Sequence, residues 1–205
     1  MRITIIGAGN VGKALGAGWR KSGHDVAYAL RAASAKSAVA VAAQGFRVVA
    51  LGESANADVI VLAVPWPAVA ETLKAAGPLA GKIVVDATNP LGPDLSLTIG
   101  FNDSAGETVA RLAPGARIVK AFNTTGAENM AKAHDFAAKP MMAMAGDDAA
   151  AKAVVAKLAE ELGFEAIDAG PLKSARLLEP LASLWIGQAY AQKFGMNFAF
   201  SVVRR

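Results

Sequence analysis

The sequence predicts a doubly wound α/β domain with a mostly parallel sheet and a short C-terminal extension. Short apolar runs alternate with stretches of helical character along most of the chain. The runs are continuously apolar, as in parallel strands that are covered by helices on both faces. With 205 residues, 54% of them hydrophobic, the chain is long enough for one domain with a substantial core.

The elements are expected in regular alternation. The expected strands are short runs rich in Val, Ile and Ala, at 2–6, 25–30, 47–50, 58–64, 82–88, 117–122 and 165–169. The expected helices are 10–22, 33–43, 67–76, 104–112, the stretch that begins at Asp147 and Asp148 and stops at Gly163, and 174–193. The segment 89–103 is expected to be a long loop, and the apolar tail 198–203 is a candidate last strand.

We treat residues 1–205 as a single domain, because no linker rich in Pro, Gly and Ser interrupts them. Its last part, 170–205, is expected to be an extension for dimer formation or substrate contact.

The first helix ends in Arg20 and Lys21, cations that suit the negative end of a helix dipole. Gly23 is then the expected left-handed cap.

Composition excludes several classes of function. The net charge of +4 is small and its basic residues are scattered, which argues against nucleic-acid binding. The chain has no cysteine, and its two histidines, His24 and His134, lie far apart, so neither a metal site nor a Ser/His/Asp triad is expected. No run is long enough to cross a membrane and no targeting segment precedes the first strand, which favours a cytoplasmic protein.

Three glycines stand between the first strand and the first helix. Gly7, Gly9 and Gly12 form the pattern G-x-G-x-x-G at a strand-to-helix junction, the context that a dinucleotide-binding fingerprint requires. Gly7 would permit the tight turn, Gly9 a close approach of the pyrophosphate, and Gly12 close packing of helix and sheet. The pyrophosphate would then lie at the positive end of the helix. A purely structural turn is the alternative.

The end of the second strand favours NADP over NAD. NAD sites usually carry an acidic residue there for the ribose 2′-hydroxyl. This chain has Arg31, Ser34 and Lys36 and no acid, and a guanidinium can bind a 2′-phosphate through two hydrogen bonds. An ordinary solvated basic loop is the alternative.

Polar residues and prolines follow the next strands. Pro65 and Pro67 break the fourth strand where the ligand crevice of such a sheet should open, and Trp66 is either a wall of the site or a surface-packed side chain. After the fifth and sixth strands come Asn89, Asn123, Thr124 and Thr125, which either meet at the nicotinamide or cap their loops. No acid or base is assigned a catalytic role. Lys120 is the one candidate proton donor, and a paired or snorkelling lysine is its alternative.

The chain resembles the F420-dependent NADP oxidoreductases, a family that includes the cytosolic domain of the STEAP metalloreductases. Motifs that carry the resemblance run in order along the chain: GAGNVG, GHDV, VPW, VDATNP, IVKAFNT, AGDD and DAGPLKSARLLEPL. Two departures are Leu30, where the family commonly has Ser, for which Ser34 is a substitute, and the loop KAFNTTG, which is closer to the metalloreductase version than to the archaeal one.

The resemblance implies a Rossmann fold, NADP(H) as cofactor, and hydride transfer to a small-molecule acceptor, F420, FMN or FAD, in a protein expected to be a homodimer. A non-catalytic NADP(H) sensor and a reductase of small carbonyls or imines are the alternatives. The residues expected to bind the cofactor are Gly7, Gly9, Asn10, Val11, Gly12, Arg31, Ser34, Lys36, Ala63, Val64, Pro65, Trp66 and Asn89. Those expected to bind the acceptor are Pro90, Asn123, Thr124 and Thr125.

Overall fold

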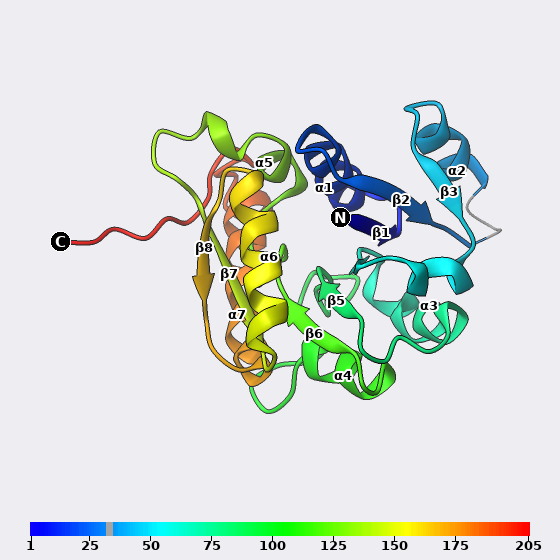
Figure 1. Ribbon diagram of the computed structural model, residues 1–205. Helices are drawn as coiled ribbons and strands as arrows, with labels where there is room; N and C mark the ends of the chain where they lie inside the picture. The colour runs from blue at the N-terminus through cyan, green and yellow to red at the C-terminus, as the bar shows by residue number, and fades with distance from the viewer. Residues whose placement is uncertain (32–34) are drawn as a thin grey trace.

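A computed structural model describes residues 1–31 and 35–205 and confirms the α/β fold, with one twisted sheet between helices (Figure 1). The strands are β1 (Arg2–Ile6), β2 (Asp25–Ala29), β3 (Arg47–Val49), β4 (Val59–Leu62), β5 (Ile83–Asp86), β6 (Arg117–Lys120), β7 (Met141–Gly146) and β8 (Glu165–Asp168). The α-helices are α1 (Asn10–Lys21), α2 (Ala35–Ala42), α3 (Val69–Ala76), α4 (Ala105–Leu112), α5 (Ala127–Ala131), α6 (Ala149–Glu161) and α7 (Ala175–Ile186). The 3₁₀ turns are η2 (Leu51–Asn56), η3 (Trp66–Ala68), η4 (Ala133–Asp135) and η5 (Leu172–Ser174), and a π turn, η6 (Gly187–Ala191), follows α7.

The strand order is β3-β2-β1-β4-β5-β6-β7-β8. The first six strands are parallel, so their carboxyl ends share one edge of the sheet. β7 is antiparallel to β6, and β8 is parallel to β7. The order reverses direction between β1 and β4, which is the place where doubly wound sheets bind their ligands.

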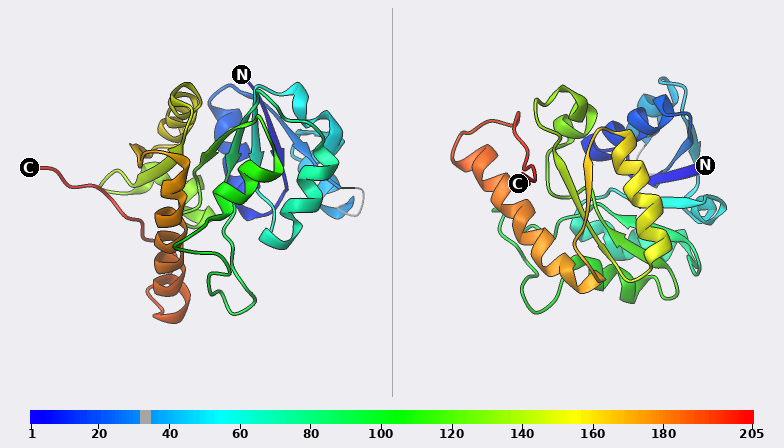
Figure 2. Two further views of the ribbon diagram at one scale, coloured as in Figure 1. Left: turned by 90° about the horizontal axis from the view of Figure 1, so that it is seen from below. Right: turned by 60° about the vertical axis from the view of Figure 1, so that its left-hand side comes forward.

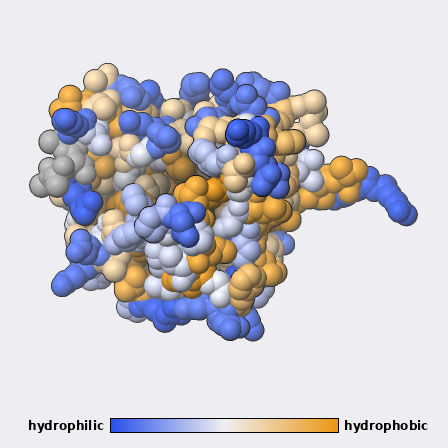
Figure 3. Space-filling model, turned by 180° about the vertical axis from the view of Figure 1, so that it is seen from behind, coloured by the Kyte–Doolittle hydropathy of each residue, from blue (hydrophilic) through white to orange (hydrophobic). Residues whose placement is uncertain are grey.

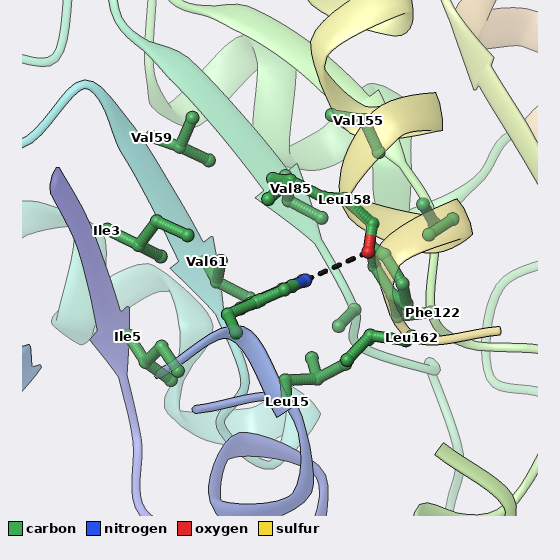
Figure 4. Close-up of a cluster of buried hydrophobic side chains, with 14 of the residues drawn as sticks. Ile3, Ile5, Leu15, Val59, Val61, Val85, Phe122, Val155, Leu158 and Leu162 are labelled. Atoms are coloured by element: carbon green, nitrogen blue, oxygen red, sulfur yellow. Dashed lines mark hydrogen bonds between the residues drawn. The ribbon is translucent and has the colours of Figure 1, made fainter. Parts of the chain in front are cut away.

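The larger hydrophobic core lies on the sheet face covered by α1 and α6. Trp19 from α1 is fully buried there, and its indole N–H donates to the Leu158 carbonyl of α6 at 2.9 Å (Figure 4). Its ring meets Phe122 edge-on, with centroids 5.4 Å apart. These contacts hold α1, whose amino end lies at the candidate site, firmly against the sheet.

A second core covers the opposite face, where Leu73 of α3 and Val109 of α4 pack against β4, β5 and β6. β7 serves both sides, because its side chains alternate between faces. Met142 and Met144 join the core under α6, whereas Ala143 and Ala145 pack against Leu178 of α7. Figure 2 shows α6 and α7 on the two sides of this part of the sheet.

Three features differ from the sequence prediction. Strand β7 was not expected, because the run MMAMAG is made of Met, Ala and Gly rather than β-branched residues. Helix α5 was not expected either, and it is only five residues long. The tail 198–203 forms no strand: Phe200 accepts one hydrogen bond from Met141 and the chain then leaves the sheet. The last helix, expected at 174–193, is α-helical from Ala175 to Ile186 and continues as the π turn Gly187–Ala191.

The predicted helix ends are confirmed. Gly23 takes a left-handed conformation with φ of 87° just after α1. The Asp148 carboxylate caps α6 by accepting from the Ala151 N–H at 2.6 Å. Within the described residues, no helix is long and apolar enough to cross a membrane.

Candidate functional site

The turn between β1 and α1 uses its three glycines for different reasons. Gly7 has a φ of 109°, and a Cβ on it would lie 2.3 Å from the Ala63 carbonyl oxygen. A Cβ on Gly12 would lie 2.3 Å from the Gly7 carbonyl oxygen. The fold itself therefore requires glycine at both positions. Gly9 is different, since its φ of −73° suits any residue and an added Cβ would meet no atom within 4 Å.

The amino end of α1 is uncapped. Gly9 precedes the helix and contributes no side-chain hydrogen bond, and the first turn contains no acidic residue. The first intrahelical bond runs from the Lys13 N–H to the Gly9 carbonyl, so the amides of Asn10, Val11 and Gly12 have no acceptor within the helix. Together with the helix dipole, these amides make a site suited to a phosphate.

Tyr28 of β2 stabilises the first turn of α1 by a hydrogen bond. Its hydroxyl donates to the Gly12 carbonyl at 3.0 Å, and burial raises its pKa to about 12, so it remains a donor at neutral pH. A Cβ on Gly16 would lie 2.2 Å from the Tyr28 hydroxyl, which explains the small residue one turn farther along α1.

A cavity of about 210 Å³ opens on one side of the α1 amino end. Six of the residues predicted to bind the cofactor line it, namely Gly7, Gly9, Arg31, Ala63, Val64 and Pro65. The full lining is Ile6, Gly7, Ala8, Gly9, Ala29, Leu30, Arg31, Ser37, Leu51, Ala63, Val64, Pro65 and Thr72. The hydroxyl of Thr72 is buried and has no hydrogen-bond partner in the described part of the chain. A bound molecule with a polar group would satisfy it.

The predicted basic residues are distributed unevenly around this cavity. Arg31 lines it with a half-exposed side chain, 4.0 Å from the Glu71 carboxylate. Lys36 is exposed on α2 and is not among the lining residues, whereas its neighbour Ser37 is. Ser34 lies outside the described residues. Trp66 is half-buried and packs against the second core, as the surface-packed alternative had it.

A second cavity, of about 480 Å³, lies on the other side of the α1 amino end. Its lining comes from α1, the loops after β5 and β6, and α7 with the turn that follows: Asn10, Val11, Asn89, Leu91, Leu95, Asn123, Thr125, Gly126, Ala127, Glu128, Trp185, Ile186 and Tyr190. Gly9 lines the first cavity and Asn10 the second, so one extended ligand could reach both by crossing the uncapped amides.

The two asparagines predicted for this region are joined to each other. Asn89 Nδ2 donates to the Asn123 carbonyl at 3.0 Å, and Asn123 Nδ2 donates to Asn89 Oδ1 at 3.1 Å. Asn123 Oδ1 is buried and has no partner among the residues that the structure describes. The neighbouring Pro90 and Thr124 are buried and are not among the lining residues. The Pro90 carbonyl instead accepts from both the backbone and the hydroxyl of Thr98.

Sequence reasoning missed the aromatic wall of the second cavity. Trp185 and Tyr190 lie near the end of the last helix, where an apolar run reads equally well as core or as a dimer contact. Glu128 was missed too, because the helix that carries it was not expected. Only the fold brings these residues beside Asn89.

Lys120 is fully buried and paired. Its Nζ donates to the Thr88 carbonyl at 2.6 Å and lies 3.0 Å from both the Asp86 and the Glu179 carboxylates. Glu179, on α7, also accepts from the backbone N–H groups of Ala105 and Gly106 at 2.9 and 3.1 Å. The alternative of a paired lysine is therefore confirmed, and Lys120 lines neither cavity.

Known proteins resemble this chain in sequence and in fold. The family described as coenzyme F420-dependent NADP oxidoreductase matches residues 2–90. Rat metalloreductase STEAP3 is 35% identical over 103 residues, which are 50% of this chain and 20% of STEAP3. The chain thus spans about a fifth of the length of this curated relative.

Solved structures extend the likeness to the whole chain. A candidate F420-dependent NADP-reductase from Arthrobacter sp. FB24 is 33% identical with a TM-score of 0.89, and the match covers 98% of this chain and 99% of that one. A hypothetical protein from Sinorhizobium meliloti is 30% identical with a TM-score of 0.75, over 85% and 87% of the two chains. A reductive aminase of Aspergillus terreus, 21% identical with a TM-score of 0.70 and matched over 63% of its length, shares the fold. These matches together establish that the chain belongs to the coenzyme F420-dependent NADP oxidoreductase family.

Proposed function

We propose that this chain is an oxidoreductase that transfers a hydride between NADP(H) and a planar acceptor, either a flavin such as FMN or FAD or the deazaflavin F420. The observation that carries the proposal is the pair of cavities on the two sides of the uncapped α1 amino end. A dinucleotide has a diphosphate between two nucleosides. It could therefore place one nucleoside near Arg31 and the other near Asn89, with the diphosphate between them.

The residues of the first cavity fit an NADP(H) molecule. Gly9 leaves room in front of the helix, Arg31 offers a guanidinium for the 2′-phosphate, and the Thr72 hydroxyl is a buried group in need of a partner. When bound, NADPH supplies the hydride. The protein holds the diphosphate with backbone amides and discriminates the phosphorylated ribose with Arg31.

The residues of the second cavity suit a flat acceptor. Trp185 and Tyr190 offer aromatic surfaces for stacking, and the joined amides of Asn89 and Asn123 form a rigid polar edge. Hydride transfer between stacked rings depends on alignment rather than on an acid or base. Two titratable residues, Glu128 and Tyr190, are among the described residues that line the second cavity. Neither forms a hydrogen bond with Asn89 or Asn123 in the structure.

Reduction of a small carbonyl or imine is less well supported, because such a reaction needs a proton donor beside the substrate. Lys120, the candidate from the sequence, is buried in contact with Asp86 and Glu179 and lines neither cavity. The reductive aminase shares the fold at 21% identity, and a shared fold alone does not imply a shared reaction.

Turnover separates an enzyme from a sensor that only binds the cofactor. NADPH oxidation would be followed by absorbance with FMN, FAD or F420 as acceptor, and NADH would serve as the control donor. We expect turnover with NADPH and at least one of the three acceptors. Binding of NADPH in calorimetry without turnover would favour the sensor, and no binding at all would refute both functions.

A further inference from the structure

One edge of the Asn89 side-chain amide is bonded to Asn123, and the other edge is free. Asn89 Nδ2 donates one proton to the Asn123 carbonyl at 3.0 Å, and Asn89 Oδ1 accepts from Asn123 Nδ2 at 3.1 Å. A side-chain amide has a second N–H and a second lone pair. Within the described residues nothing uses these two groups of Asn89, which is half-buried in the wall of the second cavity. The free edge of Asn89 therefore offers a ligand one donor and one acceptor.

Asn123 determines which way this amide faces. Turning the Asn89 amide by half a rotation would exchange its donor and its acceptor. The contacts with Asn123 exclude the exchanged orientation, because two N–H groups would then face each other, and two carbonyl oxygens as well. Asn123 is fixed in turn, since its Nδ2 also donates to the Leu178 carbonyl of α7 at 3.3 Å. The donor and the acceptor of Asn89 thus have fixed positions.

The Asn123 side chain is kept although it does not favour folding. Its Oδ1 is buried and accepts no hydrogen bond from the part of the chain that the structure describes. Phe122, directly before it, is fully buried and has a φ of 59°, in the left-handed region that residues with a side chain rarely adopt. An apolar residue at position 123 would avoid the unpaired oxygen, and strained backbone clusters at functional sites. Both observations indicate that a ligand, rather than the fold, requires this asparagine.

A buried ion pair restrains the backbone on the other side of the pair of asparagines. Lys120 Nζ donates to the carbonyl of Thr88, the residue before Asn89, at 2.6 Å. Asp86 accepts from the same ammonium at 3.0 Å, and its other carboxylate oxygen accepts from the N–H and the hydroxyl of Thr88 at 2.9 and 2.7 Å. With Thr88 held by three hydrogen bonds, Asn89 has little freedom to turn away from the cavity.

We propose that Asn89 is a specificity-determining residue that binds the amide edge of a ligand ring, and that Asn123 positions it. The matching chemistry is an N–H beside a carbonyl oxygen, because such an edge pairs with the donor and the acceptor of Asn89 at once. Two rings of the proposed reaction carry this edge: nicotinamide has a primary carboxamide, and flavins and deazaflavins have a ring imide. The inference rests on the proposed function and adds the group by which the ring is selected.

Ligand analogues that lack the N–H test the pairing directly. In the acetylpyridine analogue of NADPH, a methyl group replaces the carboxamide nitrogen. In FMN methylated on its imide nitrogen, the N–H is lost in the same way. Calorimetry would compare the binding of each analogue with that of its parent, so the measurement needs no turnover. We expect the wild type to bind at least one analogue about tenfold more weakly than its parent, and that analogue identifies the ring that Asn89 contacts.

Substitutions at the two asparagines should remove the discrimination. Asn89→Leu keeps a branched side chain without hydrogen-bonding groups, so parent and analogue should bind within about twofold of each other. Asn123→Leu leaves Asn89 in place but frees its amide to turn, so the discrimination should fall by about threefold or more. Asn102→Leu is the matched control, because Asn102 is exposed and is not among the residues that line either cavity. An apolar replacement should be tolerated there, since hydrophilic and apolar residues are already mixed at the surface (Figure 3).

A purely structural role of the pair gives a different result. Parent and analogue would then lose affinity by the same factor in Asn89→Leu, and that result would overturn the inference. A wild type that binds both analogues as tightly as their parents would overturn it too, and this comparison requires no variant to fold. Undiminished discrimination in Asn123→Leu would refute the positioning role of Asn123. NADPH and FMN that bind without turnover would count against the proposed function, and the comparison of binding would still decide the inference.

Discussion

The amino ends of α1 and α4 present the same backbone chemistry and are treated in opposite ways. At α4, the N–H groups of Ala105 and Gly106 donate to the buried carboxylate of Glu179, and the Ser104 hydroxyl accepts from the Glu107 N–H. At α1, Gly9 supplies no side chain and the amides border two cavities. One helix end is neutralised by the protein's own anion, and the other is left for an anion from outside.

The difference indicates which helix end is structural and which is functional. A carboxylate at an α-helix amino end stabilises the helix, and α4 obtains that stabilisation within the fold. α1 forgoes it, although a Cβ at position 9 would meet no atom within 4 Å. Its glycine is therefore better explained by a ligand than by folding.

Removing the anion from α4 should have the largest effect. Glu179→Leu would leave the Lys120 ammonium short of one carboxylate and two buried amides without acceptors, so we expect a loss of about 3–5 kcal/mol in unfolding free energy. Denaturant titration measures it. Adding Lys120→Met to the same chain should restore part of the stability, and a single variant as stable as the wild type would contradict a structural role for the cluster.

Placing an anion at α1 should affect binding rather than folding. Gly9→Asp would cap the helix and repel a diphosphate, so stability should change by less than about 1 kcal/mol while NADPH binding weakens by about 2–3 kcal/mol. Calorimetry with NADPH measures the binding and thermal unfolding the stability. Gly12→Ala is the contrasting control, because a Cβ there would lie 2.3 Å from the Gly7 carbonyl oxygen and should destabilise the fold. Unaltered NADPH affinity in Gly9→Asp would show that no phosphate binds at this helix.

Arg31 tests what kind of anion the α1 site receives. Arg31→Glu should weaken NADPH binding by about 1–3 kcal/mol and leave NADH binding nearly unchanged, because only NADPH carries the 2′-phosphate. Lys36→Glu changes the same charge on an exposed residue outside the cavity lining and should have a smaller effect. Equal losses for NADPH and NADH in Arg31→Glu would refute the assignment.

The sequence predicted the α1 end of this comparison and not the α4 end. The three glycines follow one strand and precede one helix, so local pattern and local function coincide. Glu179 reads in the sequence as one charge on an amphipathic helix, and the backbone amides that it binds lie more than seventy residues away. The pairing of Asp86 with Lys120 could have been predicted from the sequence. Each is the last residue of its strand, and the two strands are parallel neighbours with these residues in register.

The acceptor cavity was the least predictable part. Asn89 and Asn123 could be proposed because the strands before them end at one edge of the sheet. Trp185 and Tyr190 come from a helix that follows two unexpected elements, β7 and α5. β7 is antiparallel to β6, and α7 packs against β7 through Leu178. This packing places the end of α7 beside the second cavity.

Removing a second interaction at the α4 amino end, the ion pair between Glu107 and Arg176, should have the smallest effect on the unfolding free energy and a distinct pH dependence. Glu107 forms a bidentate pair with Arg176 of α7 at 2.8 Å, and the hydrogen bonds from that guanidinium lower the pKa of the carboxyl below its usual value. A carboxyl whose pKa is lower in the folded state contributes stability above its unfolded pKa, and this contribution disappears as the pH falls through the folded value. Because both side chains are about a fifth to a quarter exposed, we expect Glu107→Gln to cost about 1 kcal/mol at neutral pH. In unfolding measured from neutral to acid pH, the wild type and the variant should converge below the ordinary carboxyl range. A gap that stays constant with pH would show that the charge of Glu107, and therefore its ion pair with Arg176, does not provide the stabilisation.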